Sequence, residues 1–157
     1  MANQQVRKKH TIVLASGVFD LLHLGHVRFL EEAKKAGGKD AELIVIVARD
    51  NTVRKRKGMK PIMSEDQRRA LVESLKVVDE AILGYENFNM DQVIDKIKPD
   101  IIAMGYDQKD MTDTVEKTVA KRGLSIKIVK IDKFREDELN SSSEIKRKII
   151  EEYAQHS

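Results

Sequence analysis

Short apolar runs alternate with amphipathic stretches along most of the chain. Five runs of four to seven residues predict buried strands: 11–16 (TIVLAS), 42–48 (ELIVIVA), 80–83 (EAIL), 100–105 (DIIAMG) and 126–131 (IKIVKI). Strands that alternate with helices at this spacing favour a parallel sheet with right-handed crossovers. The predicted fold class is therefore α/β: a doubly wound, Rossmann-like domain with about five parallel strands and helices on both faces.

Capping residues mark where several of the intervening helices begin. A capping box at residues 64–67 (SEDQ) opens one helix, and the serine-led stretch at 141–144 (SSSE) opens the last one. In this last helix we expect Ile145, Ile149 and Tyr153 to face inward.

Length and composition limit the class of protein. A chain of 157 residues without an internal repeat or a linker is expected to form one domain over 1–157, with a flexible leader at 1–10. It has no cysteine, and no apolar run approaches the roughly 20 residues that span a bilayer. We expect a cytoplasmic protein with no membrane partner.

The charges are nearly balanced, but one segment is strongly basic. The formal net charge is only +3, which argues against a dedicated nucleic-acid binder. Five of the seven residues at 54–60 (RKRKGMK) are basic, and they follow the second predicted strand. A flexible basic loop there would let Lys57, next to Gly58, neutralise a polyphosphate. The alternative is an ordinary solvated charge run.

Two histidines stand where the first strand gives way to a helix. Ligands of doubly wound sheets bind beyond the carboxyl ends of the strands, so this connection is a candidate site. His23 and His26 are three residues apart and can face one point, while Gly25 allows a bulky anion to approach the backbone. A helix amino end also attracts anions, so the pattern predicts a phosphate site. The alternatives are two ordinary, partly buried histidines or a two-histidine metal site.

Polar residues also follow the fourth and fifth predicted strands. Asp107, two residues after Gly105, could bind a ribose hydroxyl or a base amino group, or it could only cap a helix. After Phe134, the triple serine at 141–143 offers hydroxyls and backbone donors to an anion, or serves only as a helix cap. Neither a dinucleotide-binding glycine motif nor a P-loop is present.

These motifs together resemble a known superfamily. G-V-F-D at 17–20 with H-L-G-H at 23–26 resembles the nucleotidylyltransferase signature G-x-[FY]-D-x-x-H-x-G-H, which the cytidylyltransferases share. The stretches at 44–62, 99–108 and 141–150 are most similar to the archaeal FAD synthases, which are FMN adenylyltransferases. The chain departs from the cytidylyltransferase R-T-E-G-I-S-T block, because Arg135 lies one residue further from the serine.

The resemblance implies transfer of AMP from ATP to the phosphate of FMN by direct in-line attack, giving FAD and pyrophosphate. His23, His26 and Lys57 would be catalytic, and Mg²⁺ or another divalent metal would be carried by the ATP phosphates, without protein metal ligands. The implied nucleotide-binding residues are Gly17, Val18, Phe19, Asp20, His23, Leu24, Gly25, His26, Arg68, Gly105, Asp107, Phe134, Ser141, Ser142 and Ser143. Arg68 would reach the phosphates, Val18 and Phe19 would offer backbone contacts, and Asp20 would chiefly fix its loop.

Two other functions stay open from the sequence. One is a cytidylyltransferase that makes a CDP-alcohol such as CDP-glycerol from CTP and glycerol 3-phosphate. The other is a non-catalytic nucleotide- or RNA-binding module that uses residues 54–60. Apolar pairs at 77–78 and 82–83 suit either a homodimer contact or core packing. The sequence does not decide the base, the acceptor, the metal preference, the oligomeric state or the role of Arg135.

Overall fold

The computed structural model describes residues 10–134 and 140–156. Most of the expected leader and Arg135 therefore lie outside the described residues. Within these two ranges, no helix is both long enough and apolar enough to cross a membrane.

The centre of the protein is a parallel sheet whose strand order is β3-β2-β1-β4-β5. Its strands are β1 (Thr11–Gly17), β2 (Ala41–Val47), β3 (Glu80–Leu83), β4 (Ile101–Gly105) and β5 (Lys127–Ile131). β1 and β2 pair along their whole length, from Thr11 opposite Ala41 to Gly17 opposite Val47. All five strands lie where the apolar runs predict them.

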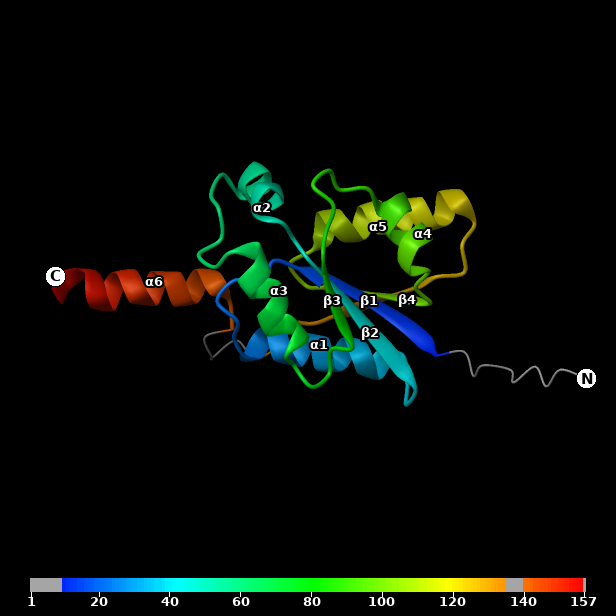
Figure 1. Cartoon of the computed structure of the whole chain (residues 1–157), viewed down its shortest axis with the longest axis horizontal. Helices are drawn as coiled ribbons and strands as arrows, with labels where there is room; N and C mark the ends of the chain where they lie inside the picture. Colours follow the sequence, from blue (N-terminus) through cyan, green and yellow to red (C-terminus); the bar gives the residue numbers. More distant parts are fainter. Residues whose placement is uncertain (1–9, 135–139, 157) are drawn as a thin grey trace, which may run out of the picture.

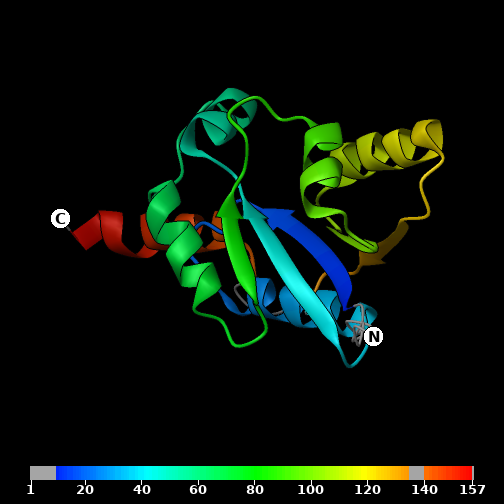
Figure 2. The ribbon, with the colours of Figure 1, turned by 45° about the vertical axis from the view of Figure 1, so that its right-hand side comes forward.

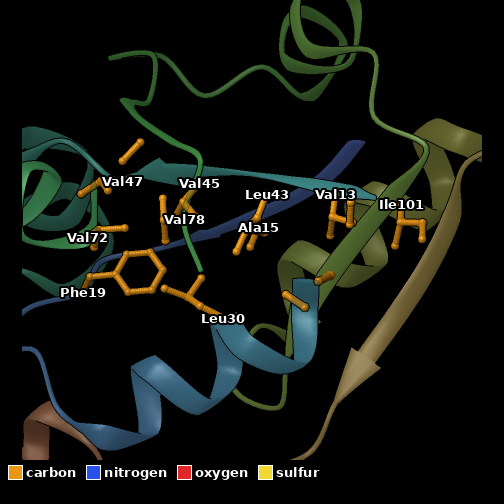
Figure 3. Close-up of a cluster of buried hydrophobic side chains, with 14 residues drawn as sticks. Val13, Ala15, Phe19, Leu30, Leu43, Val45, Val47, Val72, Val78 and Ile101 are labelled. Carbon is orange, nitrogen blue, oxygen red and sulfur yellow. The ribbon is translucent and has the colours of Figure 1, made fainter. Parts of the chain in front are cut away.

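Helices cover both faces of this sheet (Figure 2). On one face, α1 (Leu24–Ala36) and α3 (Glu65–Glu73) contribute Leu30 and Val72 to a core with strand residues such as Val13 and Val45 (Figure 3). On the other, α4 (Met90–Ile97) and α5 (Lys109–Arg122) pack on the residues that alternate with these along the strands. The doubly wound Rossmann-like prediction is confirmed.

The strand order reverses between β1 and β4, and this is where such folds bind ligands. Gln108 joins the two strand ends at that point. Its side-chain amide donates to the carbonyl of Ser16 at 2.9 Å and accepts from the backbone N–H of Gly105 at 2.8 Å. The connections after β1 and β4 are thus held side by side.

The basic segment forms a helix, so the prediction of a flexible loop there is wrong. α2 (Asp50–Lys57) lies beyond the carboxyl ends of β2 and β3 (Figure 1). Asp50 in its first turn and four cations in its last turn complement the helix dipole. Gly58 ends the helix in the left-handed conformation (φ 79°), and its N–H donates to the carbonyl of Arg54 at 2.8 Å.

The last helix does not pack along the sheet. α6 (Ser142–Tyr153), followed by a short 3₁₀ turn (Ala154–His156), projects away from the body of the protein (Figure 1). None of its residues is buried. The expectation that Ile149 and Tyr153 face inward is wrong, because they are 50% and 67% exposed.

Candidate active site

The connection between β1 and α1 has a strained backbone. Phe19 and Leu21, on either side of Asp20, have positive φ angles of 55° and 49°. Such conformations cost on the order of 1–3 kcal/mol each and persist only where their surroundings enforce them. Here the side chain of Phe19 is buried in the core (Figure 3), so only its backbone can meet a ligand.

The two histidines lie directly against each other at the amino end of α1. Their rings stack with centroids 3.7 Å apart and an interplanar angle of 25°. The backbone N–H of His23 donates to Nδ1 of His26 at 3.2 Å. A neutral His26 that accepts at Nδ1 carries its hydrogen on Nε2, which is therefore a donor.

Both rings are held neutral at pH 7. Burial, followed by the neighbouring His23, lowers the pKa of His26 to about 3, against an opposing effect of Asp20. Burial also lowers the pKa of His23, partly opposed by the carboxylate of Glu144. The pair therefore offers hydrogen-bond donors without a fixed charge, and an arriving phosphate would favour its protonation.

The amino end of α6 lies against this histidine turn. A Cβ on Gly25 would lie 2.9 Å from the backbone oxygen of Asn140 and 2.9 Å from the ring of His23, so only glycine fits there. Ser142 donates its hydroxyl to the backbone oxygen of Asp20. Ser141 caps the helix by accepting from the N–H of Glu144 at 3.1 Å.

This packing brings the predicted histidines and serines together. The backbone N–H groups of Ser142 and Ser143 lie in the first turn of α6, where a helix leaves donors without intrahelical partners. Donors of this kind, beside the two imidazoles, form an arrangement that suits a phosphate chain.

Asp20 braces the site from inside. Its carboxylate, on a residue only 3% exposed, accepts the backbone N–H groups of Ile62 at 2.8 Å and Met63 at 3.0 Å, and lies 3.3 Å from the ammonium of Lys146. Burial raises the pKa of Asp20, but these hydrogen bonds and Lys146 together hold it below its ordinary value. Its side chain therefore joins the β1–α1, α2–α3 and α6 segments.

Arg68 is sealed inside the protein, so direct contact with phosphates is a wrong prediction. Its side chain is fully buried, and its guanidinium donates to the carbonyls of Met63, Val18 and Ala48 at 2.7 to 2.9 Å. It also pairs with the carboxylate of Asp50 at 2.7 Å. Because a buried guanidinium needs such partners, Arg68 supports the loop that carries the site.

The remaining predicted residues surround the site at the strand ends. Gly17 and Gly105 end β1 and β4, and Leu24 at the start of α1 is 45% exposed. Asp107 is exposed just after β4, and the ring of Phe134 lies 5.4 Å below the guanidinium of Arg28. Lys57 is exposed at the end of α2, and the described residues show no contact between its ammonium and the histidines.

The described side chains do not form a metal site of their own. Within residues 10–134 and 140–156, no group of three or more histidine, aspartate or glutamate residues is placed to hold a cation. Asp20, the carboxylate beside the histidines, is already occupied by two N–H groups and Lys146. A divalent cation here would need ligands from a bound substrate.

A family model described as cytidylyltransferase-like matches residues 14–148. The chain belongs to the cytidylyltransferase-like family. It is 50% identical over 139 residues to a protein named FAD synthase from Thermoplasma volcanium, covering 88% of this chain and 94% of that protein. It is 48% identical to the FAD synthase of Aciduliprofundum boonei, covering 88% of this chain and 90% of that protein.

A solved structure agrees with the cytidylyltransferase-like fold. The crystal structure of "the lipopolysaccharide core biosynthesis protein" from Thermoplasma volcanium GSS1 superposes with a TM-score of 0.73 at 47% identity, over 81% of this chain and all of that chain. A protein of unknown function from Archaeoglobus fulgidus has a TM-score of 0.62 at 21% identity and supports the fold alone. The resemblance inferred from the motifs is confirmed.

The sequence patterns do not predict three residues of this cytidylyltransferase-like site. Lys146 lies four residues after Ser142, and this spacing, which puts both on one helix face, was an available signal. Gln108 and Asn140 carry no such signal. Their roles come from contacts with Ser16 and with the carbonyl of Phe134 that exist only in the folded chain.

Proposed function

We propose that this chain is an FMN adenylyltransferase, an FAD synthase, that transfers AMP from ATP to the phosphate of FMN. The observation that carries this proposal is the neutral, stacked pair of His23 and His26 against the serine-led amino end of α6. It is supported by relatives named FAD synthase that are about half identical to this chain over most of its length.

In the proposed reaction, a phosphate oxygen of FMN attacks the α-phosphorus of ATP in line. A new P–O bond forms to the α-phosphorus, its bond to the bridging oxygen of pyrophosphate breaks, and that oxygen takes the electron pair. The FMN phosphate is mostly a dianion at pH 7, because its second pKa is about 6, so no side chain has to remove a proton. Catalysis then consists of positioning and of stabilising charge in the transition state.

Each part of the site has a place in this reaction. His26, donating from Nε2, and His23 would bind the α-phosphate and the leaving oxygen, where negative charge grows. The N–H groups of Ser142 and Ser143 would hold the β- and γ-phosphates at the amino end of α6. Lys57 would neutralise the equatorial oxygens. Mg²⁺, held by the phosphates themselves, supplies further neutralisation when it is bound.

The nucleotide would extend from these phosphates toward the reversal point of the sheet. Gly17, Val18 and Phe19 would contact it through their backbone, and Gly105, Asp107 and Phe134 would border the ribose and base. Leu24, which is 45% exposed at the start of α1, would lie beside the nucleotide.

Location and assembly complete the proposal. We propose a cytoplasmic enzyme, since its substrate ATP is used there, with small-molecule partners and no nucleic acid. We also propose a homodimer, because Ile149, Ile150 and Tyr153 are 50 to 67% exposed on one side of α6, a surface that a second copy would cover. Sedimentation equilibrium tests the dimer, and a monomer at every concentration would contradict it.

The function is tested by pyrophosphate release. The protein is incubated with Mg²⁺, one of the four nucleoside triphosphates, and either FMN or glycerol 3-phosphate. We expect release with ATP and FMN, together with FAD. Release only with CTP and glycerol 3-phosphate would instead identify a cytidylyltransferase.

His26→Ala tests the observation on which the proposal rests. Removing one preorganised donor typically costs about 2.7–4 kcal/mol of transition-state stabilisation. We therefore expect kcat to fall at least about a hundredfold while circular dichroism still reports a folded protein. A folded variant with near-wild-type kcat would remove His26 from the site.

A further inference from the structure

The segment that joins α2 to α3 exposes large apolar side chains. In this α2–α3 segment (residues 58–63), Met59 is 74% and Ile62 is 65% exposed, among the highest values for large apolar residues in the described chain. Lys57 and Lys60, both exposed, flank Met59. The segment therefore combines apolar surface with positive charge.

The α2–α3 segment is fixed beside the catalytic turn. The N–H of Ile62 and the ammonium of Lys146 meet at the same carboxylate oxygen of Asp20, at 2.8 and 3.3 Å. The backbone oxygen of Asp20 in turn accepts from Ser142 at the start of α6. Figures 1 and 2 both show this segment next to the amino-terminal half of α6. Ile62 is thus near the donors proposed to hold the phosphates.

We propose that the α2–α3 segment is the acceptor subsite and that Met59 and Ile62 pack against the ring system of the flavin. This inference rests on the proposed function and names where its second substrate binds. FMN combines a broad, flat ring system with a dianionic phosphate, and the segment offers the complementary surface: apolar side chains for the ring and lysines for the anion. Ring binding here takes Met59 and Ile62 out of water and directs the flavin phosphate toward Lys57 and the histidines.

The test is a double variant, Met59→Ser with Ile62→Ser. Because both side chains are mostly exposed, the fold should survive. Binding is measured by the quenching of flavin fluorescence in the presence of Mg²⁺ and a non-hydrolysable ATP analogue, with FMN and separately with riboflavin. Riboflavin has the ring but no phosphate, so it reports on ring contact alone.

We expect the double variant to bind both flavins at least tenfold more weakly, while KM for ATP stays within twofold of wild type. Leu71→Ser is the matched control, since Leu71 is an exposed apolar residue on α3 outside the segment. It should leave flavin binding unchanged.

Unchanged flavin affinity in the folded double variant would overturn the subsite. The same holds if the double variant only shifts a monomer–dimer equilibrium, because the surface would then belong to a second copy of the chain. Failure of the wild type to form FAD from ATP and FMN would contradict the proposed function instead. The riboflavin measurement needs no turnover, so it decides the subsite in either case.

Discussion

Lowering the pH is expected to destabilise this protein through His26. The pKa of His26 is lowered from 6.5 to about 3, chiefly by burial. Between these values the unfolded chain binds a proton that the folded chain does not bind, so stability rises with pH across this window. The contribution is complete above pH 6.5 and is lost progressively as the pH falls toward 3. Burial also lowers the pKa of His23, so this residue acts in the same direction.

The size of the effect follows from the width of the window. One pKa unit corresponds to about 1.4 kcal/mol, so the 2.5 units between pH 6.5 and pH 4 give an upper limit of roughly 3.5 kcal/mol. Water entry and small shifts of the turn reduce this figure. The effect is still a large share of the free energy of unfolding of a typical domain, which is about 5–15 kcal/mol. Asp20 contributes little in this range, because the unfolded chain binds the corresponding proton only near and below pH 3.8.

The assay is urea unfolding at several pH values between 7.5 and 4, followed by far-ultraviolet circular dichroism. The comparison is His26→Gln, which keeps a polar side chain at the same position but cannot titrate. We expect the wild type to lose up to about 3 kcal/mol more than the variant on going to pH 4. Equal losses in the two proteins would show that His26 is not held neutral by its burial.

Four further substitutions test other parts of the site. Gly25→Ala puts a methyl group 2.9 Å from the backbone oxygen of Asn140. The melting temperature should therefore fall by an amount that corresponds to about 1–3 kcal/mol, and kcat should fall with it. Wild-type values of both would show that the start of α6 adjusts freely. Lys57→Ala should lower kcat but change the free energy of unfolding by less than about 0.5 kcal/mol, because the Lys57 side chain is exposed. Higher KM values at unchanged kcat would show that Lys57 is a binding residue only. Asp20→Asn should lower the free energy of unfolding by about 1–3 kcal/mol, as measured by thermal unfolding. This loss should exceed that of Lys146→Met, because Asp20 also accepts hydrogen bonds from two backbone N–H groups. The reverse order would contradict the bracing role of Asp20.

The sequence predicts the sheet well because its signal is local. Continuous apolar runs of β-branched residues have few alternatives to a strand buried on both faces, and each run coincides with one observed strand. The capping box at residues 64–67 also lies where α3 begins, with Ser64 accepting from the N–H of Gln67 at 3.4 Å. Even the convergence of His23, His26 and the serines follows from the rule that ligands bind at strand ends.

The wrong predictions concern places where one local sequence pattern is compatible with two different structures. Residues 50–57 contain one buried side chain, Val53, so no apolar stripe indicates the helix, and a charge run suggests a loop. Arg68 shows the same ambiguity, since an arginine suits a phosphate as well as a group of carbonyls. The carbonyls of Val18 and Ala48 that bind it lie 50 and 20 residues away in the chain, and only folding brings them to it. In α6, apolar spacing predicted burial, but no element of the described chain lies alongside its distal half.

The contacts of Asp20 explain why the G-x-[FY]-D-x-x-H-x-G-H signature includes an aspartate between the glycine and the histidines. The imidazoles and the serines come from distant segments, with Asp20 and Ser142 122 residues apart in the chain. A misplacement of about 1 Å between such groups can cost about a hundredfold in rate. A single buried carboxylate, held between two strained residues, fixes the α2–α3 segment through Ile62 and Met63 and α6 through Lys146. Its hydrogen bonds therefore help to enforce the positive φ angles beside it. The aspartate of the motif thus fixes the geometry of the candidate site, and this bracing role accounts for a buried carboxylate between the glycine and the histidines.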